Sequence, residues 1–308
     1  MNEGPKIWLG LTGGAVAVAI WAGWIVVTRH AVSDPGARVD PVVLAICRAG
    51  LPAVLLAPII WQRGLLPEGA RFWPILLMAL GWGAPFTGFV GMGLQTVPAS
   101  LFGPLVPGLA PIIVAVLAWA IFRERPGAQF AAGLVLIGLA CALILGQWLA
   151  GGSFAELRGA PWLLMASLGI SIYTVMFRLS GLSPLEATAY ISLYSFPMLL
   201  VWGLLKFDEV AQPGLPEWGF HLLTQGLITG VFAVLAYGTA VRHLGAARGS
   251  TANALVPVCV ALLGMVVLDE TLTALDWVAV FAASLGVAVV NGLVRWRKGA
   301  SRMHPTRR

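Results

Sequence analysis

Arg48 is the side chain best placed to do chemistry in the apolar part of this sequence. It stands in VLAICRAGLPAVLLAP (residues 43–58), where no other residue carries a charge. A guanidinium in such surroundings could bind a carboxylate through two parallel hydrogen bonds. Alternatively, it could be structural, with the long side chain reaching outward or donating to carbonyls exposed beside Pro52. We favour the structural role, because the corresponding later run, 184–205, contains no arginine.

Aromatic and amide side chains form a second group of candidates. They recur at helical spacing within apolar runs, so that several share one helix face. Such rings could wall a cavity and such amides could bind a solute inside it. They could also pack against lipid or tie neighbouring helices together. We predict that the substrate-binding residues are Trp21, Trp24, Trp82, Phe86, Tyr173, Gln225 and Asn253.

Catalytic and metal chemistry have little support in the sequence. The patterns HExxH and GxSxG are absent, and no paired carboxylates stand inside the apolar runs. Cys47, Cys141 and Cys259 fall in three separate apolar runs, which is neither a disulfide framework nor a metal site. We therefore expect no enzymatic activity, no metal and no cofactor.

Composition places these residues in a membrane. The 308 residues are 59% hydrophobic and 10% charged, with a mean hydropathy of +0.88, whereas about a quarter of a soluble domain is charged. The apolar residues come in blocks of about twenty, the length with which a helix crosses about 30 Å of hydrocarbon. The sequence predicts an all-α membrane protein with ten transmembrane helices, or spans one to ten, at 7–27, 41–61, 73–93, 99–122, 128–148, 161–178, 184–205, 218–241, 247–267 and 275–294.

The charges between these spans predict an orientation. With the N-terminus in the cytoplasm, fourteen of the 19 Lys and Arg residues lie inside, as the positive-inside rule requires. Both termini are then cytoplasmic in a multi-pass protein of the cell (inner) membrane. Much of the net charge of +6 comes from the basic tail after Val294. Such a tail beside a last membrane helix is typical of a topology determinant or of a segment that contacts anionic lipid. We expect no nucleic-acid partner.

The chain also repeats itself. LAPIIVAVLAWAIFRE (109–124) aligns without a gap with LVPVCVALLGMVVLDE (255–270), and WIVVTR (24–29) parallels YTVMFR (173–178). Each half therefore holds five spans, and an odd number per half places the halves in opposite orientations across the bilayer. Inverted repeats are typical of secondary transporters, whose substrate site lies near mid-membrane between the repeats. We place the two repeats at residues 1–150 and 151–308.

At these residues the chain resembles a known family. AYGTAVRHLGAARGSTANALVPVCVALLGMVVLDE (236–270), LAPIIVAVLAWAIFRER and IWAGWIVVTR are similar to the EamA domain of the drug/metabolite transporter superfamily. The resemblance covers essentially the whole chain as two tandem domains. It implies a ten-helix exporter of small organic solutes, with a cavity lined by spans one, three, four, six, eight and nine.

From pattern and resemblance together we expect a secondary transporter that exports small organic metabolites by alternating access. Amino acids, aromatic or other apolar ones among them, are the expected substrates, because the candidate cavity is aromatic and uncharged. Multidrug or other metabolite efflux is the alternative, and a channel or a non-transporting membrane protein is a further one. The lipid bilayer and a small-molecule substrate are the expected partners, and we expect a monomer.

Overall fold

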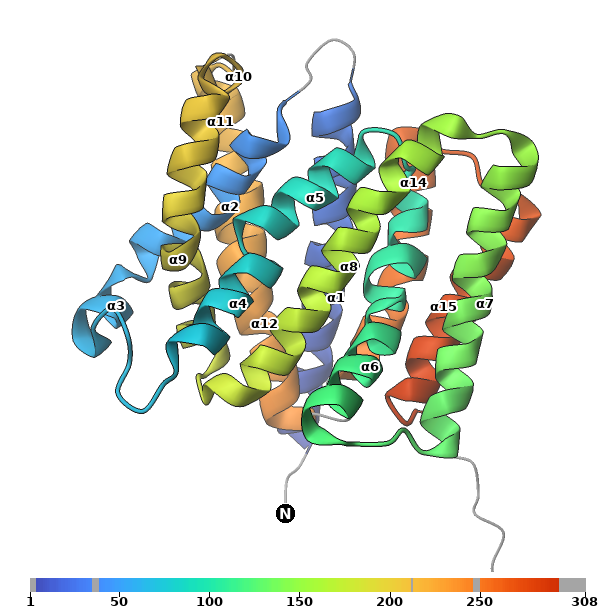
Figure 1. Cartoon of the computed structure of the whole chain (residues 1–308), viewed down its shortest axis with the longest axis horizontal. Helices are drawn as coiled ribbons and strands as arrows, with labels where there is room; N and C mark the ends of the chain where they lie inside the picture. The colour runs from blue at the N-terminus through green and yellow to red at the C-terminus, as the bar shows by residue number, and fades with distance from the viewer. Residues whose placement is uncertain (1–3, 35–38, 212, 246–249, 294–308) are drawn as a thin grey trace, which may run out of the picture.

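The structure is a computed structural model that describes residues 4–34, 39–211, 213–245 and 250–293, and every element in these ranges is helical (Figure 1). Seven helices are long and apolar enough to cross a membrane, a bent pair can form an eighth span, and two shorter apolar helices complete the set. These segments coincide with the ten predicted spans. The tail after Val294 and the first residues of span nine, 247–249, lie outside the described residues.

The first five spans are built as follows. Span one is α1 (Gly4–Ser33), span two is α2 (Pro41–Leu55) with α3 (Ala57–Arg63), and span three is α4 (Phe72–Trp82) with α5 (Ala84–Leu94). Span four joins the 3-10 turn η1 (Ala99–Leu101), the π-helical turn η2 (Pro104–Gly108) and α6 (Ala110–Phe122), and span five is α7 (Ala128–Gly151).

The second five spans follow the same plan. Span six is α8 (Phe154–Ser180) and span seven is α9 (Pro184–Leu205), followed by the short α10 (Phe207–Ala211). Span eight joins α11 (Leu215–His221), the π-helical η3 (Leu222–Phe232) and α12 (Ala233–Leu244). Span nine is the 3-10 turn η4 (Ser250–Leu255) with α14 (Val256–Leu268), and span ten is α15 (Ala274–Val290).

Span two is not the single straight helix that its hydropathy predicts. It bends by 55° between α2 and α3. Pro52 lies within α2 and Pro58 in the first turn of α3, and a proline removes a backbone donor and clashes with the preceding turn. No residue of α3 is buried, so this end of the span leaves the bundle.

The helix contacts have the symmetry of an inverted repeat. Helix α1 of span one packs against α12 and α14 of spans eight and nine. Helix α8 of span six packs against α4 and α5 of span three and α6 of span four. Helix α2 packs on α9, and α7 on α15. Exchanging each span with the one five places along maps these pairs onto one another, as two repeats related by a pseudo-two-fold axis require.

Two left-handed residues mark the same relation in the backbone. Arg123 (φ 57°) and Asp269 (φ 53°) are the only non-glycine residues with positive φ in the described part of the chain. Each ends its helix, α6 or α14, with its backbone N–H bonded to a carbonyl of the last turn. They are partners in the sequence repeat, and each directly precedes a glutamate, Glu124 or Glu270.

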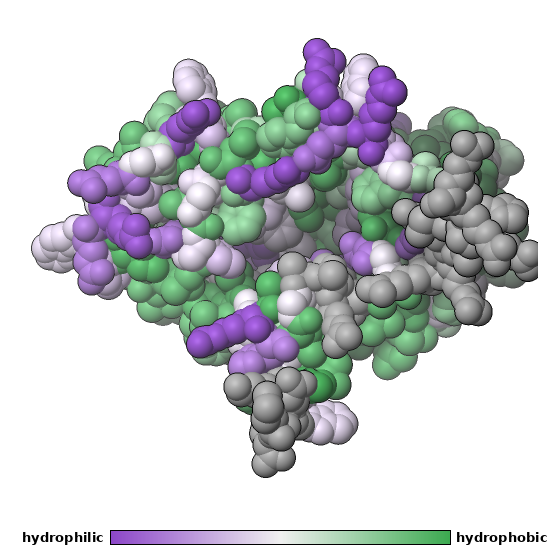
Figure 2. All heavy atoms as spheres, turned by 90° about the horizontal axis from the view of Figure 1, so that it is seen from below, coloured by the Kyte–Doolittle hydropathy of each residue, from purple (hydrophilic) through white to green (hydrophobic). Residues whose placement is uncertain are grey.

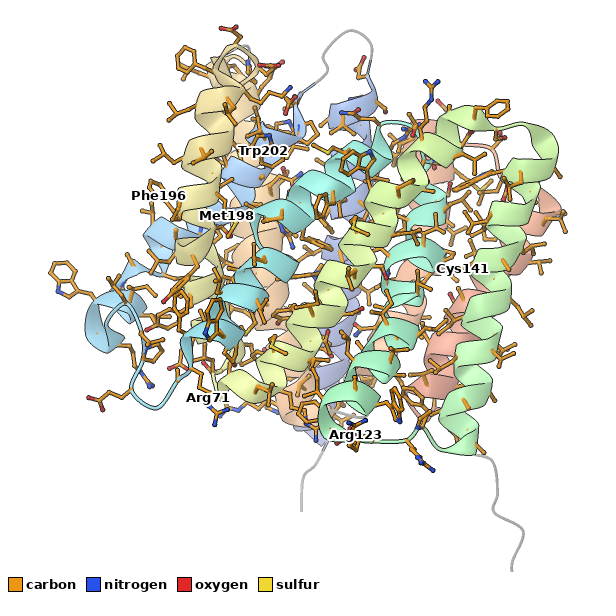
Figure 3. All side chains as sticks on the ribbon, viewed as in Figure 1. Arg71, Arg123, Cys141, Phe196, Met198 and Trp202 are labelled. Carbon is orange, nitrogen blue, oxygen red and sulfur yellow. The ribbon has the colours of Figure 1, made fainter. Side chains whose placement is uncertain are left out.

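The two ends of the bundle differ from its sides. Figure 3 shows Arg71 and Arg123 at one end, the end that the charge pattern predicts to be cytoplasmic. Figure 2 views this end, where hydrophilic residues are spread over the surface. Around the sides, exposed residues such as Phe196 and Val201 of α9 are apolar. Phe196 lies on the outer side of α9 (Figure 3), as expected of a surface in contact with lipid.

Glycines allow α4 and α8 to cross without intervening side chains. A Cβ atom built on Gly81 would lie 2.4 Å from the carbonyl oxygen of Gly169, and a Cβ atom on Gly169 would lie 2.5 Å from the oxygen of Gly81. Small residues at such crossings let membrane helices approach to backbone contact. This crossing sets the spacing of spans three and six.

We expect Gly169→Ala to destabilise the protein, because the added methyl group overpacks a backbone contact at a cost of about 1–3 kcal/mol. The matched control is Gly146→Ala in α7, where a Cβ atom meets nothing within 4 Å. Thermal unfolding of the detergent-purified variants measures the difference. A midpoint for Gly169→Ala equal to or above that of Gly146→Ala would contradict the close crossing.

Candidate functional site

A cavity of about 400 Å³, here called the central chamber, lies between spans one, three, four, five, six, nine and ten. One wall is aromatic and consists of Trp21, Trp24, Trp82 and Phe86. Thr174 and Asn253 are among its few polar lining residues. The volume is in the range of small-molecule sites, which are mostly apolar with a few placed polar groups.

A second cavity of about 400 Å³, the arginine chamber, adjoins the first. The two chambers share Trp21, Trp82 and Asn253 as lining residues, and the arginine chamber adds Arg48 and Tyr237. The Tyr237 ring lies 5.3 Å from that of Trp21, and Tyr237 lines the arginine chamber together with Asn253. Together the two adjoining chambers make up the candidate site.

The aromatic wall is a chain of rings in contact. Trp82 lies 4.4 Å from Phe86 and 5.4 Å from Tyr173, measured between ring centroids. Trp24 also stacks on Phe86, with 6.1 Å between ring centroids. Aromatic pairs at these separations stabilise one another by about 0.5–1.5 kcal/mol beyond their burial. The wall is therefore a preformed surface for an apolar or aromatic group.

Gln225 supports this wall from behind. It is fully buried in η3, and it is not among the described residues that line either chamber. Its amide oxygen accepts a hydrogen bond from Nε1 of Trp24, and its amide nitrogen donates to Oγ1 of Thr28 at 3.1 Å. The amide thus ties span eight to span one and fixes the orientation of the Trp24 ring.

Arg48 adopts neither of the two structural arrangements that we predicted from the sequence, which were an outward-reaching side chain and hydrogen bonds to carbonyls beside Pro52. Its residue is 8% exposed, so the side chain does not reach outward, and its Nη1 atom is buried without a hydrogen-bond partner. Its Cζ atom lies 4.2 Å from the Trp24 ring centroid and 5.4 Å from that of Trp82. Among the residues described, no carboxylate and no carbonyl pairs with the guanidinium. Cation–π contact with two tryptophans is what holds it.

Small residues bring Arg48 to this position. A Cβ atom on Gly226 would lie 2.6 Å from the carbonyl oxygen of Cys47, and one on Gly230 would lie 2.7 Å from Pro52. These two glycines, four residues apart, face α2 from η3. A π-helical segment is frequent at functional sites, and here it places Thr229 and Gly230 against the arginine chamber.

The central chamber leads toward one end of the molecule. Its lining residues Val114, Phe130 and Thr174 also line a cavity of about 430 Å³, the Glu124 vestibule, beside Glu124 and Arg178. A cavity at the opposite end, beside Arg29 and Glu270, shares no described lining residue with the central chamber. The candidate site therefore borders the cavity at the end that carries Glu124.

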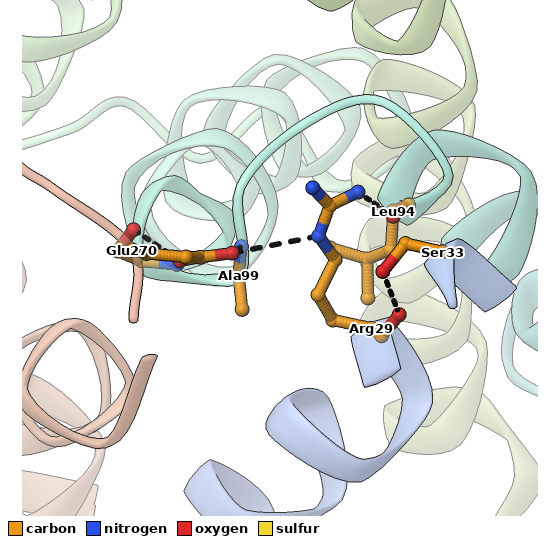
Figure 4. A network of polar contacts seen from close by, with 6 residues as sticks. Arg29, Ser33, Leu94, Ala99 and Glu270 are labelled. Atoms are coloured by element: carbon orange, nitrogen blue, oxygen red, sulfur yellow. Dashed lines mark hydrogen bonds and ion pairs between the residues drawn. The ribbon is translucent and has the colours of Figure 1, made fainter. Parts of the chain in front are cut away.

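A network of polar contacts holds the opposite end together (Figure 4). Glu270 accepts hydrogen bonds from the backbone N–H groups of Ala99 and Ser100, at 2.7 and 3.0 Å, and from the Ser100 hydroxyl at 2.6 Å. Nε of Arg29 lies 3.4 Å from the same carboxylate, and Nη1 of Arg29 donates to the carbonyl oxygen of Leu94. Side-chain exposures of 19% for Arg29 and 10% for Glu270 show that the pair is largely buried.

The repeat-related pair at the other end is open to solvent. Arg178 and Glu124, partners of Arg29 and Glu270 in the sequence repeat, form a two-point ion pair at 2.8 and 3.0 Å. Their side chains are 59% and 49% exposed. The hydrogen bonds from Arg178 lower the pKa of Glu124 below its ordinary value. The same interaction is thus buried at one end and exposed at the other.

The sequence-predicted residues fall into two groups. Trp21, Trp24, Trp82, Phe86 and Asn253 line the central chamber, and Tyr173 lines the arginine chamber. Gln225 stands behind the wall. Whether these residues bind substrate stays a prediction.

Sequence reasoning missed Tyr237 and Ser192, which line the arginine chamber. Spans two and seven border this chamber, although the resemblance implied a cavity without them. Tyr237 stands in the AYGTAVRHLG motif that carried the resemblance, and that was its only signal. Ser192 lies in a helix whose apolar pattern does not single it out.

Comparisons with known proteins agree with this architecture. The family model described as "EamA-like transporter family" matches residues 8–146 and 157–292. A WAT1-related chloroplastic protein of Arabidopsis thaliana is 31% identical over 256 residues, and the match spans 79% of this chain but only 60% of that protein. An uncharacterised transporter of Synechocystis sp. is 28% identical over 266 residues, 78% of each chain. One crystal structure at 19% identity has a TM-score of 0.59 over 93% of this chain and 98% of that chain, which shows a shared fold.

The hydrogen bond between Gln225 and Trp24 makes a testable prediction. Gln225→Leu leaves the indole N–H and the Thr28 hydroxyl without their partner, at a cost of about 1–3 kcal/mol each for a buried group. Trp24→Phe removes the donor, so the double variant should lose less stability than the sum of the single variants. Thermal unfolding midpoints of the three variants measure the coupling. Additive losses would contradict a direct bond.

Proposed function

The chain belongs to the EamA-like transporter family, and from that premise we propose that it exports small organic solutes, amino acids with apolar side chains foremost. It is a multi-span membrane transporter of small molecules. The observation that carries the finer proposal is the character of the two chambers. Their walls are aromatic, and among the described residues no acidic side chain lines either one.

The polar groups of the chambers favour a neutral or zwitterionic solute. Hydroxyl and amide side chains, such as Thr174 and Asn253, can bind a small polar group. The wall of Trp82, Phe86 and Tyr173 suits an apolar or aromatic side chain. An amino acid with an aromatic side chain combines both parts in a volume that each chamber can hold.

Alternating access is supported by the two repeat-related ion pairs. The Arg29–Glu270 pair is buried at the closed end, and the Arg178–Glu124 pair is exposed at the open end. Because inverted repeats can exchange conformations, the opposite state would bury Arg178–Glu124 and expose Arg29–Glu270. The positive-inside pattern makes the open end cytoplasmic, so the structure corresponds to a state ready to take up solute for export. Both termini are then cytoplasmic, in the inner membrane.

Efflux of drugs or other metabolites is the second candidate, because an aromatic chamber also accepts large apolar molecules. The family relation favours transport over catalysis. We further propose that the repeats meet near residue 150, between α7 and α8, and that one chain forms a complete carrier.

We expect Trp82→Ala to weaken solute binding at least about tenfold, because Trp82 borders both chambers and contacts Phe86 and Tyr173. Uptake of labelled phenylalanine and of cationic dyes into proteoliposomes, at matched protein content, measures the effect. The control is Trp61→Ala, since Trp61 of α3 is 91% exposed. Unchanged kinetics in Trp82→Ala would remove the chambers as the transport site.

The proposal that the two ion pairs exchange their buried and exposed states leads to a separate prediction. In a protein without native cysteines, Phe102→Cys places a thiol in the central chamber. Glu270→Gln weakens charge-assisted hydrogen bonds by about 1 kcal/mol, which should expose that thiol about fivefold more often from the Glu270 end. The readout is the labelling rate by a membrane-impermeant maleimide applied at that end.

Glu217→Gln is the matched control, because this glutamate caps α11 with a hydrogen bond that glutamine also makes. Its labelling rate should equal that of the parent protein. If Glu270→Gln and Glu217→Gln gave the same rate, the Arg29–Glu270 pair would not hold that end closed.

A further inference from the structure

We propose that Arg48 is the substrate's carboxylate ligand and that Asn253 accepts a hydrogen bond from the substrate's amino group, so that the site takes α-amino acids and related carboxylates. This inference rests on the proposed function and names the substrate class of the same site. It reverses the structural role that the sequence alone favoured for Arg48.

The first argument is the lack of any anion for Arg48. The guanidinium is buried, lines the arginine chamber, and has an Nη1 atom without a hydrogen-bond partner. No carboxylate of the described residues forms an ion pair with it. A buried charge is costly unless it is paired, and in membrane spans such residues mark solute or ion pathways. A solute that supplies the missing carboxylate would remove this cost only while it is bound.

The second argument is that the guanidinium is held still. Its Cζ atom lies over the Trp24 ring, 4.2 Å from the ring centroid, and the Trp24 indole is itself fixed by Gln225. The Nη1 atom of this guanidinium has no hydrogen-bond partner, so its N–H donors are available to a carboxylate. Two parallel N–H···O bonds from arginine give such a contact both strength and orientation.

The third argument is a complementary group in the same chamber. Oδ1 of Asn253 is buried without a hydrogen-bond partner, as is Nη1 of Arg48. Both residues line the arginine chamber, so its wall contains an unpartnered acceptor and an unpartnered cationic donor. An α-amino acid offers the matching pair, an ammonium donor and a carboxylate, and its side chain would meet the wall of Trp21 and Trp82.

The charge of the chamber also argues against cationic drugs, the alternative class of substrate. A cationic drug would enter a chamber that holds an uncompensated Arg48 and, among the described lining residues, no aspartate or glutamate. Like charges in a medium of low dielectric constant repel strongly. The same chamber therefore selects for a carboxylate and against an amine that lacks one.

The experiment compares four probes that share one ring. Phenylalanine, 3-phenylpropanoate, phenylalaninamide and 2-phenylethylamine are titrated calorimetrically into the purified full-length protein. We expect the two carboxylates to bind wild type at least about tenfold more tightly than the two amines, since a hydrogen bond to a charged group decides the difference. Arg48→Met should abolish this preference, and Arg48→Lys should keep it in weakened form because lysine offers only a point charge.

Two controls separate binding from folding. Arg71→Met changes an exposed arginine outside both chambers and should leave the preference unchanged. The unfolding midpoint of Arg48→Met should not fall below that of wild type, because removing an unpaired buried charge offsets the loss of its cation–π contacts with Trp24 and Trp82. A Tm loss in Arg48→Met, together with an unchanged carboxylate preference in Arg48→Lys and Arg48→Met, would restore the structural role.

The remaining outcomes are also decisive. If neither carboxylate binds wild type, or if chloride alone raises the Tm as much as phenylalanine does, Arg48 is not a carboxylate ligand for the solute. If proteoliposomes still transported any of the four probes, the proposed export function would be retained even though the Arg48 proposal had failed. The export of apolar amino acids fails only if no probe is carried.

Discussion

The hydrocarbon of a bilayer offers no water, so each polar group inside this bundle must find its partner within the protein. The structure meets this constraint almost everywhere. Hydroxyls of Ser167 and Ser171 in α8 donate to the carbonyl oxygens of Val106 and Ala110 in span four. The Gln225 amide satisfies the Trp24 indole. Against that background, the unpartnered atoms of Arg48 and Asn253 stand out, because both residues line one cavity.

Because the repeat is inverted, the same local sequence features occur at both ends of the molecule. Each repeat finishes its fourth helix with a left-handed residue followed by a glutamate, and each places an arginine at the end of its first helix. The same side chains therefore meet as Arg29–Glu270 and as Arg178–Glu124. Their burial differs because the two ends of the bundle are packed differently in this structure. The alternating access that we propose needs a second conformation in which the two repeats have exchanged their arrangements.

The irregular helices line the two chambers. Span four begins with a 3-10 turn and a π-helical turn, span eight contains a π-helical segment, and span nine begins with a 3-10 turn. Broken helices inside membranes are tolerated where they are buried in protein or line a cavity. Each of these three spans contributes lining residues, among them Val106, Thr229 and Asn253. The departures from regular geometry thus lie where a solute would be bound.

The sequence by itself determined the class, the ten spans and the inverted repeat, because apolar blocks, loop charges and a periodic motif are local properties of the chain. It also identified the aromatic wall, since Trp82 and Phe86 share a helix face whatever their neighbours. Only the tertiary structure decided what each polar side chain does. Whether Gln225 faces a solute or an indole depends on Trp24, 201 positions away. Whether Arg48 has an anion likewise depends on residues distant in the sequence. Helical spacing cannot reveal such contacts, because they arise only when the spans pack together.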